Sequence, residues 1–598
     1  MVVIAVLVIA SVCAFEYTMS LAKDVQRSNT VRAEMDVGDG ALEYAFGYWR
    51  EICREKTNLS RPGKDFANLP LPTAALFGNN IPNFTAQVAP NADPNHPATI
   101  ANFQIQAIDP EYNVIDQTIT PPSGVGMAIK TETIYYLASA DVSLTARGAP
   151  ITTKLRRVFE KQLTSPWMYA IFFIDDLEIQ PSPPMNVTGA VQTNANIYTA
   201  MSTLNFSSQM SYGNDWYIGF HPLDTTHNGT TPASPTWPSN RPPTREQGIQ
   251  PYGLNSTQIF STSDTNPNND SYRELLLQAN SNYPDPFTNL QDPNNPIHAR
   301  YYDQADVRIL IGAGNVVSIL NQANTLLSSK SIGTDALIFA TYTSAVSTGT
   351  TIQDNRENAQ VTLTTLDVSK LYAAYKNGGV LAGSNFQGVV YISDTTAASA
   401  PANQRRAILV KNGSSLPTGG LTIVSDNGVY IQGDFNTGGT GTNVPSNKTG
   451  TANNPLVPTV SGYTRQPAAI AADAVMVLSN SWVNSNSSAS VTSRVASNTT
   501  INAAFISGNV PSGAQTGSYS GGAENFPRFH EDWSNAQFTY YGSMVELYQS
   551  KYYTGIWGKS NVYNPPTRKW YFDTNFYKTP PPGSLILVMY NKGRWFTN

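Results

Sequence analysis

The strongest hydrophobic pattern lies at the start of the chain. Residues 2–10 are apolar without interruption, and a longer, more polar stretch follows them. In that stretch apolar residues return at steps of three and four, which trace one face of a helix: Leu42, Ala45, Phe46, Trp49, Ile52 and Cys53. We therefore predict one helix over residues 1–55, apolar in its first third and amphipathic beyond it.

The apolar run is short for a membrane span. A span needs about 20 apolar residues, and extending the run to Ala22 takes in Glu16, which is costly in lipid. A secretory signal peptide needs a basic segment before the run and a small-residue cleavage site after it, and we find neither. We expect the run to stay on the protein and to occupy a membrane only before it packs against other protein.

The remaining chain has the patterns of β-structure. Residues 56–185 contain alternating runs at 133–140 and 154–159 and a continuous apolar run at 166–174, so we predict a β-rich domain there. Residues 186–380 should begin a β-solenoid and carry a loop-rich insertion at 207–300, which is polar and rich in Pro, Asn and Asp.

Residues 381–598 repeat short strand patterns with Gly, Asn and Asp between them. Those residues suit tight corners, so this region is predicted to be a β-solenoid of stacked rungs. A β-sandwich stays open as the alternative, because the spacing has no strict period. The fold class predicted for the whole chain is α+β: a long N-terminal hydrophobic helix followed by mainly-β globular domains, the last of them solenoidal.

Composition and charge narrow the function. Charged residues make up 13% of the chain, against about 25% in ordinary soluble domains, which favours a β-rich extracellular protein. The net charge of -5 offers no basic stripe for nucleic acid. Cys13 and Cys53 are the only cysteines; we expect both to be unpaired and buried, and they cannot form a cysteine zinc cluster.

The candidate catalytic groups are few. The five histidines are scattered, without a zinc-protease or nucleophile-elbow motif. His530 precedes Glu531 and Asp532. We favour a structural role for these three residues, as a polar corner between strands, over a catalytic pair of His530 with a carboxylate. A glycosidase needs two carboxylates at a set separation in space, and neighbours in sequence, such as Asp175 and Asp176, do not establish that. We predict that the protein is not an enzyme.

One segment has the spacing of a metal loop. Asp264, Asn266, Asn268 and Asp270 place oxygen side chains at positions 1, 3, 5 and 7, as a calcium loop does. Asn269 stands where such loops have glycine, and Leu275 replaces their final glutamate. Ca²⁺ is therefore the one cofactor that the sequence suggests, with chance in an Asn-rich chain as the alternative.

Asn-x-Ser/Thr sequons are frequent, which would suit glycosylation of a surface protein or follow by accident from the composition. The candidates include Asn83, Asn186, Asn228 and Asn255.

Three stretches carry a resemblance to a known family. They are the helical segment 32–46, the entry into β-structure at 165–172 with 189–198, and the run 519–529 followed by Trp533. In that order, after an apolar N-terminus, they resemble type IV pilins and pseudopilins, and PilX-type minor pilins in particular.

The resemblance implies how the chain is processed and assembled. It implies a prepilin cut before the first apolar residue, methylation of Met1, and packing of Val6 and Leu7 in a filament core. Pilins usually have Glu at position 5, where this chain has Ala5. The first acid here is Glu16, which we expect to pair with Lys23 or Arg27 of a neighbouring subunit.

The function predicted is a structural subunit of a type IV pilus-like filament on a bacterial cell surface. It would self-assemble into a homo-oligomeric filament, insert in the inner membrane beforehand, and expose its β-rich domains for adhesion, with surface glycans as contacts. The alternatives are a tip adhesin or secretion pseudopilin present in few copies, and a membrane-anchored β-solenoid enzyme acting on polysaccharide.

Overall fold

The structure is a computed structural model of the 598-residue chain. It describes residues 2–54, 68–70, 99–108, 115–119, 129–146, 149–251, 272–278, 300–441, 459–514, 519–557 and 562–597, without 182, 228, 240–241, 246–247, 249 and 586. These residues form two compact units. The first comprises 1–116, 132–163 and 590–598, and the second 117–131 and 164–589. The division of the chain into segments 1–55, 56–185, 186–380 and 381–598 stays a prediction.

The first unit consists of one long helix and an antiparallel sheet. Helix α1 (Val2–Arg54) runs unbroken through Gly38 and Gly40, which confirms the predicted N-terminal helix. The sheet has the order β1–β2–β4–β5–β32, and β3 also pairs with β4. Its strands are β1 (Asn68–Pro70), β2 (Thr99–Ala107), β3 (Ile115–Ile119), β4 (Ile129–Ala146), β5 (Ala149–Thr164) and β32 (Leu587–Thr597).

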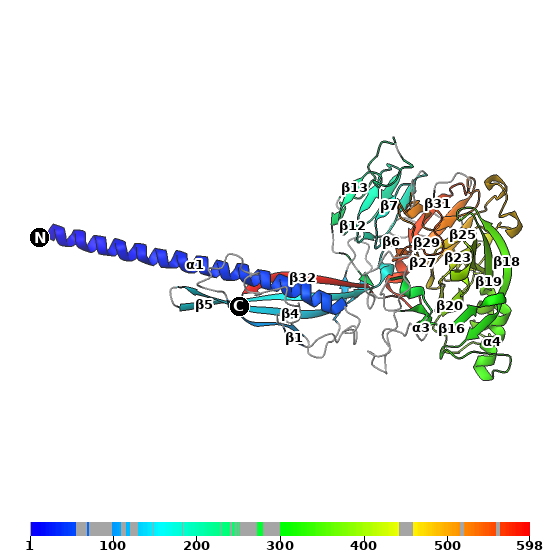
Figure 1. The fold of residues 1–598 in the computed structure, drawn as a ribbon, viewed down its shortest axis with the longest axis horizontal. Coiled ribbons are helices and arrows are strands. Elements are labelled where there is room, and N and C mark those ends of the chain that lie inside the picture. Colours follow the sequence, from blue (N-terminus) through cyan, green and yellow to red (C-terminus); the bar gives the residue numbers. More distant parts are fainter. Residues whose placement is uncertain are drawn as a thin grey trace. The chain divides into compact units, whose positions relative to one another are not determined.

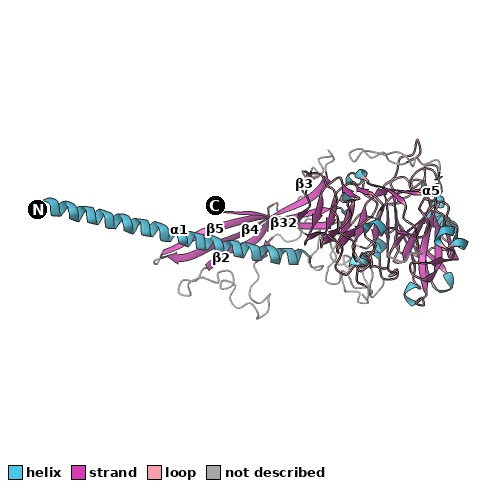
Figure 2. Cartoon of the chain, turned by 90° about the horizontal axis from the view of Figure 1, so that it is seen from above, coloured by secondary structure: helices cyan, strands magenta, loops and turns pink. Residues whose placement is uncertain are grey.

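The second half of α1 lies along this sheet, beside β4, β5 and β32 (Figures 1 and 2). The side chains of Leu42, Ala45 and Trp49, which the helical spacing had placed on one face, are all completely buried. A side chain on Gly38 would come within 2.5 Å of Leu155 Cδ1 on β5. Glycine at this position therefore lets the helix approach the sheet closely.

The second unit is built mainly from parallel strands. Its largest sheet has the spatial order β14–β12–β9–β6–β30–β27–β24–β22–β20–β16–β17, in which only β17 is antiparallel to its neighbour. The strands are β6 (Ile171–Phe173), β9 (Val191–Thr193), β12 (Met210–Tyr212), β14 (Thr244–Arg245), β16 (Val307–Ile311), β17 (Val317–Leu320), β20 (Val389–Asp394), β22 (Leu421–Val424), β24 (Ala468–Ala472), β27 (Ala504–Ser507) and β30 (Met544–Glu546).

From β19 to β25, successive strands of the chain alternate between a second, six-stranded sheet and this one. Figure 1 labels several strands of both sheets. The six-stranded sheet contains β18 (Val346–Asp354), β19 (Ala359–Asp367), β21 (Gln404–Lys411), β23 (Gly428–Gln432), β25 (Val475–Leu478) and β28 (Arg528–Phe529). Three smaller sheets contain β26 (Thr499–Asn502), β29 (Gln537–Gly542) and β31 (Thr567–Phe572); β7 (Leu177–Ile179), β10 (Ile197–Thr199) and β13 (Trp216–Ile218); and β8 (Met185–Val187) with β11 (Leu204–Phe206).

The order of the stack differs from the order of the chain. From β16 to β30 the chain adds one layer after another, and β30 then pairs with β6, which precedes all of them in sequence. The layers β6, β9 and β12 continue the same sheet from that point. Segments more than 370 residues apart are therefore neighbours at this join, where Val545 lies opposite Phe172.

Helices and short elements complete the second unit. They are α3 (Tyr301–Gln304), α4 (Gly333–Ala345), α5 (Val368–Tyr375) and β15 (Gln250–Pro251). Strand β15 pairs with Leu587 and Val588 of β32. The side chain of Asp367 caps α5 by accepting from the Ser369 N–H at 3.1 Å. Helix and mainly-β units together confirm the predicted α+β class.

Two of the short strand patterns within residues 381–598 are each divided between two strands in the structure. The pattern at 501–508 divides at Ala503 into β26 and β27, and the pattern at 538–545 divides at Ser543 into β29 and β30. Both break residues are fully buried, and the turn residues before them, Asn502 and Gly542, stand singly within apolar runs, so each run has the pattern of one strand. The first part of the predicted insertion also forms β12 and β13 in the stack.

Candidate functional site

The first half of α1 exposes its apolar side chains. Eight large ones are 40% to 70% exposed: Val8, Ile9, Val12, Phe15, Tyr17, Met19, Leu21 and Val25. At 100° per residue, Val8, Val12, Phe15 and Met19 form one stripe, while Tyr17, Leu21 and Val25 lie near the opposite side. Cys13 is free and exposed rather than buried as predicted, because no other described element covers this half of the helix. Exposed apolar surfaces of this extent are typical of sites that interact with protein or membrane.

The predicted assembly residues lie at this end of the chain. Met1 is outside the described residues, and Val6 and Leu7 belong to α1, although their side chains are not described. Glu16 is exposed and takes part in no ion pair among the described residues. Within the part of the chain that the structure describes, no helical stretch is long and apolar enough to span a membrane.

The second half of α1 is tied to its sheet by charge as well as by packing. Arg157 of β5 donates to Glu43 at 2.7 Å and to Asp39 at 2.9 Å, one helical turn apart. Lys592 of β32 also binds Glu43. Burial alone would raise the pKa of Glu43, but hydrogen bonds and charge from Lys592 and Arg157 outweigh burial and lower it. These contacts fix the rotation of the helix on the sheet.

Glu34 lies at the boundary between the exposed and the covered half of α1. Its side chain is completely buried and accepts hydrogen bonds from Thr153 Oγ1 and from the Leu144 N–H, the latter at 3.0 Å. Burial raises its pKa, against the lowering effect of those two donors. Towards the N-terminus from this residue the helix surface is mostly exposed, and towards the C-terminus it is largely covered.

The predicted calcium ligands Asp264, Asn266, Asn268 and Asp270 lie outside the described residues, as do the sequon residues Asn83, Asn228 and Asn255. Among the described residues, no group of three or more His, Cys, Asp or Glu could hold a metal ion. Asn186 is exposed on β8, where its Oδ1 accepts from Asn205 Nδ2 at 3.1 Å. A glycan on Asn205, which begins a second sequon, would replace one of the two hydrogens on that donor nitrogen.

The acidic residues around His530 do not face a common space. The Glu531 carboxylate accepts two bonds of 2.6 Å from the backbone N–H and hydroxyl of Ser479. Asp532 instead accepts from Ser534 and from Asn564, at 2.6 and 2.9 Å. His530 is 2% exposed, and burial lowers its pKa to about 4. The interpretation of this segment as a polar corner agrees with these contacts.

Asp175 and Asp176 also have separate surroundings. Asp176 Oδ2 lies 3.4 Å from His221 Nε2, and Asp176 Oδ1 accepts from the Asn196 side chain at 2.9 Å. The backbone N–H of Asp176 donates to Asp175 Oδ1 at 2.8 Å. Burial raises the pKa of Asp175. Burial also acts to raise the pKa of Asp176, but the hydrogen bonds from His221 and Asn196, together with the charge of His221, outweigh burial and lower it. Both residues therefore fasten the turn between β6 and β7.

The second unit contains a cavity of about 420 Å³. Its lining includes Glu524, Tyr519 and Phe529 from the segment that resembles the pilin family. Its other walls come from residues far apart in sequence, including Gln180, His227, Arg356, Trp557 and Arg568. The sequence contained no local signal for this site, because its residues meet only when the parallel layers are stacked.

Comparison with known proteins does not assign the chain to a family. No family model matches the chain, and no curated protein matches it. Among solved structures, the competence-associated pilin ComZ from Thermus thermophilus aligns with 82% of this chain and 88% of its own, at 9% sequence identity and a TM-score of 0.26. The neighbour is a pilin, but a TM-score this low shows neither a shared fold nor a shared function.

Proposed function

We propose that the chain is a structural subunit of a pilus-like extracellular filament, assembled through the first half of α1. The observation that supports this proposal is the difference between the two halves of this helix. One half is packed and ion-paired to its own sheet, whereas the other exposes eight large apolar side chains. We interpret the parallel layers of the second unit as a β-solenoid displayed on the filament surface.

The energetics favour extensive packing of the exposed half. Burying the exposed parts of these eight large apolar side chains contributes on the order of 10 kcal/mol. Association costs roughly 4–15 kcal/mol, so that most of this surface must be covered in a stable filament. A single buried charge in the stripe would then prevent assembly, because an unpaired charge in an apolar contact costs several kcal/mol.

Glu16 supplies the register in this proposal. It is the first acid of the chain and is flanked on the helix surface by the apolar residues Ile9 and Val12. Packing neighbours around it requires a cation, and Lys23 or Arg27 of an adjacent subunit would supply one. Before assembly the same apolar half would rest in the inner membrane.

The test is electron microscopy of surface material sheared from cells that produce the chain. Phe15→Asp should abolish fibres, while Tyr217→Asp, at an exposed aromatic of the second unit, should leave them intact. Glu16→Arg should reduce assembly, and adding Arg27→Glu should restore it. Fibres formed normally by Phe15→Asp, or a wild-type chain found only as a membrane monomer, would refute the proposal.

A further inference from the structure

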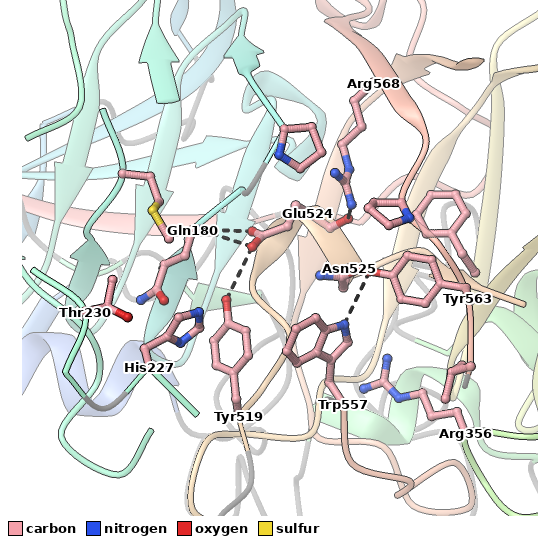
Figure 3. A pocket seen from close by; sticks show the side chains of 15 residues that line it. Gln180, His227, Thr230, Arg356, Tyr519, Glu524, Asn525, Trp557, Tyr563 and Arg568 are labelled. Atoms are coloured by element: carbon pink, nitrogen blue, oxygen red, sulfur yellow. Dashed lines mark hydrogen bonds between the residues drawn. The ribbon is translucent and has the colours of Figure 1, made fainter. Parts of the chain in front are cut away.

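The cavity of the second unit has aromatic walls whose polar atoms are already engaged (Figure 3). The Trp557 indole N–H donates to the Tyr563 hydroxyl at 3.3 Å, and that hydroxyl donates to Asn525 Oδ1. Tyr519 meets Trp557 edge to face, with ring centroids 5.1 Å apart. These rings therefore offer carbon surface, rather than hydrogen-bonding groups, to whatever occupies the cavity.

Two buried side chains in the lining have polar atoms without partners. Gln180 is 4% exposed, and neither its amide oxygen nor its amide nitrogen has a hydrogen bond to any described residue. Arg568 is 7% exposed; Nη2 donates to the Glu524 carbonyl at 3.1 Å, but Nε and Nη1 have no hydrogen-bond partner among the described residues. Its Cζ atom lies 5.7 Å from the Trp570 ring centroid and 6.0 Å from that of Phe529. Figure 3 shows the Gln180 amide near His227 and Thr230, and the Arg568 guanidinium directed towards Glu524. Buried polar groups of this kind normally have partners, so a ligand that donates and accepts would complete the site.

Glu524 adds a carboxyl group that can both donate and accept hydrogen bonds. Its carboxylate accepts from the backbone N–H of Gln180 at 3.2 Å and from the Tyr519 hydroxyl at 3.3 Å. Burial raises the pKa of Glu524 to about 7, although the charge of Arg568 opposes the shift. Near neutral pH this carboxyl group is therefore available in both protonation states.

From this combination we propose that the cavity binds one or two residues of a neutral glycan. A sugar ring presents an apolar face of C–H groups and a rim of hydroxyls, each of which donates and accepts. The face suits Trp557 and Tyr519, and the rim suits Gln180, Glu524 and Arg568. A purely apolar ligand would leave the amide and guanidinium unpaired. A neutral ligand rich in hydroxyls can pair with both the Glu524 carboxyl group and the Arg568 guanidinium, whereas an anion would be repelled by the first and attracted by the second. The volume is within the range of small-molecule pockets.

The inference deepens the proposed function, since a filament exposed at the cell surface would meet such glycans, but binding itself does not require a filament. It is tested with purified full-length chain by calorimetric titration with methyl glycosides of glucose, galactose, mannose and N-acetylglucosamine. Adenosine monophosphate and indole serve as the nucleotide and apolar comparisons. At least one glycoside should bind, and the two comparison ligands should not.

Gln180→Leu is the informative variant, because leucine keeps the approximate volume and the backbone N–H that holds Glu524. Glycoside affinity should fall by about 10- to 100-fold, with an unchanged or higher Tm, since unpartnered buried polar atoms are removed. Tyr217→Ala is the matched surface control and should bind normally. Failure of all four glycosides, preferential binding of the nucleotide or indole, or unchanged affinity in Gln180→Leu would overturn the inference. Glycoside binding by Phe15→Asp separates this result from filament assembly.

Discussion

Two phenylalanines in one helix test whether its halves have different tasks. Phe46 is 8% exposed and Phe15 is 66% exposed, and both belong to α1. Phe46 packs against Phe159 and Trp49 with ring centroids 5.2 and 5.9 Å apart, and Lys592 Nζ lies 5.3 Å from its ring centroid. The same change, Phe→Ala, can therefore be made at a buried and at an exposed position of one element.

The expected magnitudes follow from burial. Phe46→Ala should cost the first unit about 4 kcal/mol, because a buried phenylalanine is replaced by a cavity. This corresponds to roughly a 1000-fold loss of amide protection in the β4–β5 hairpin. Phe15→Ala should change the stability of the isolated chain by less than about 0.5 kcal/mol, yet it should weaken filament assembly.

Hydrogen exchange read peptide by peptide over residues 129–164 measures this effect, with residues 389–432 of the second unit as an internal reference. The reference peptides should keep their protection in both variants. Equal losses at 129–164 in the two variants would refute the division of α1 into an anchored and an exposed half. Unchanged protection in Phe46→Ala would show that its aromatic contacts do not stabilise the sheet.

Three further predictions concern the second unit. Burial raises the folded-state pKa of Glu531 to about 7 from 4.5, so ionisation destabilises the fold as pH rises from 4.5 to 7; Glu531→Gln should stabilise the protein by up to about 3 kcal/mol at pH 8 and have little effect at pH 4 in urea unfolding. Asp473 accepts from Arg273 at 3.1 Å and from the N–H groups of Lys551, Tyr552 and Tyr553. Asp473→Ala should therefore cost about 3–5 kcal/mol in the same assay, whereas a loss below 1 kcal/mol would contradict this role. If Asp264, Asn266, Asn268 and Asp270 bind Ca²⁺, chelation should lower the Tm; an unchanged melting curve would remove the site from consideration.

Local patterns were sufficient for several elements. The helical spacing of Leu42, Ala45, Phe46 and Trp49 predicted which face of α1 is buried, because a helix repeats every 3.6 residues whatever lies opposite it. Alternation in β4 works in the same way: Tyr136, Ala138, Ala140 and Val142 are all completely buried. The corners at Ala503 and Ser543 could not be placed from such patterns, because Asn502 and Gly542 are single turn residues within apolar runs.

The long helix, its two kinds of surface and the mainly-β chain after it follow from residues that are close in sequence. The pairing of β30 with β6, the ion pairs of α1 with Arg157 and Lys592, and the cavity lined by Gln180, Glu524, Trp557 and Arg568 emerge only from the folded chain. Parallel strands pair through backbone hydrogen bonds, and these bonds are the same for every residue type. The choice of neighbour is made by the burial of many side chains at once, and residues separated by hundreds of positions share a site only after that choice.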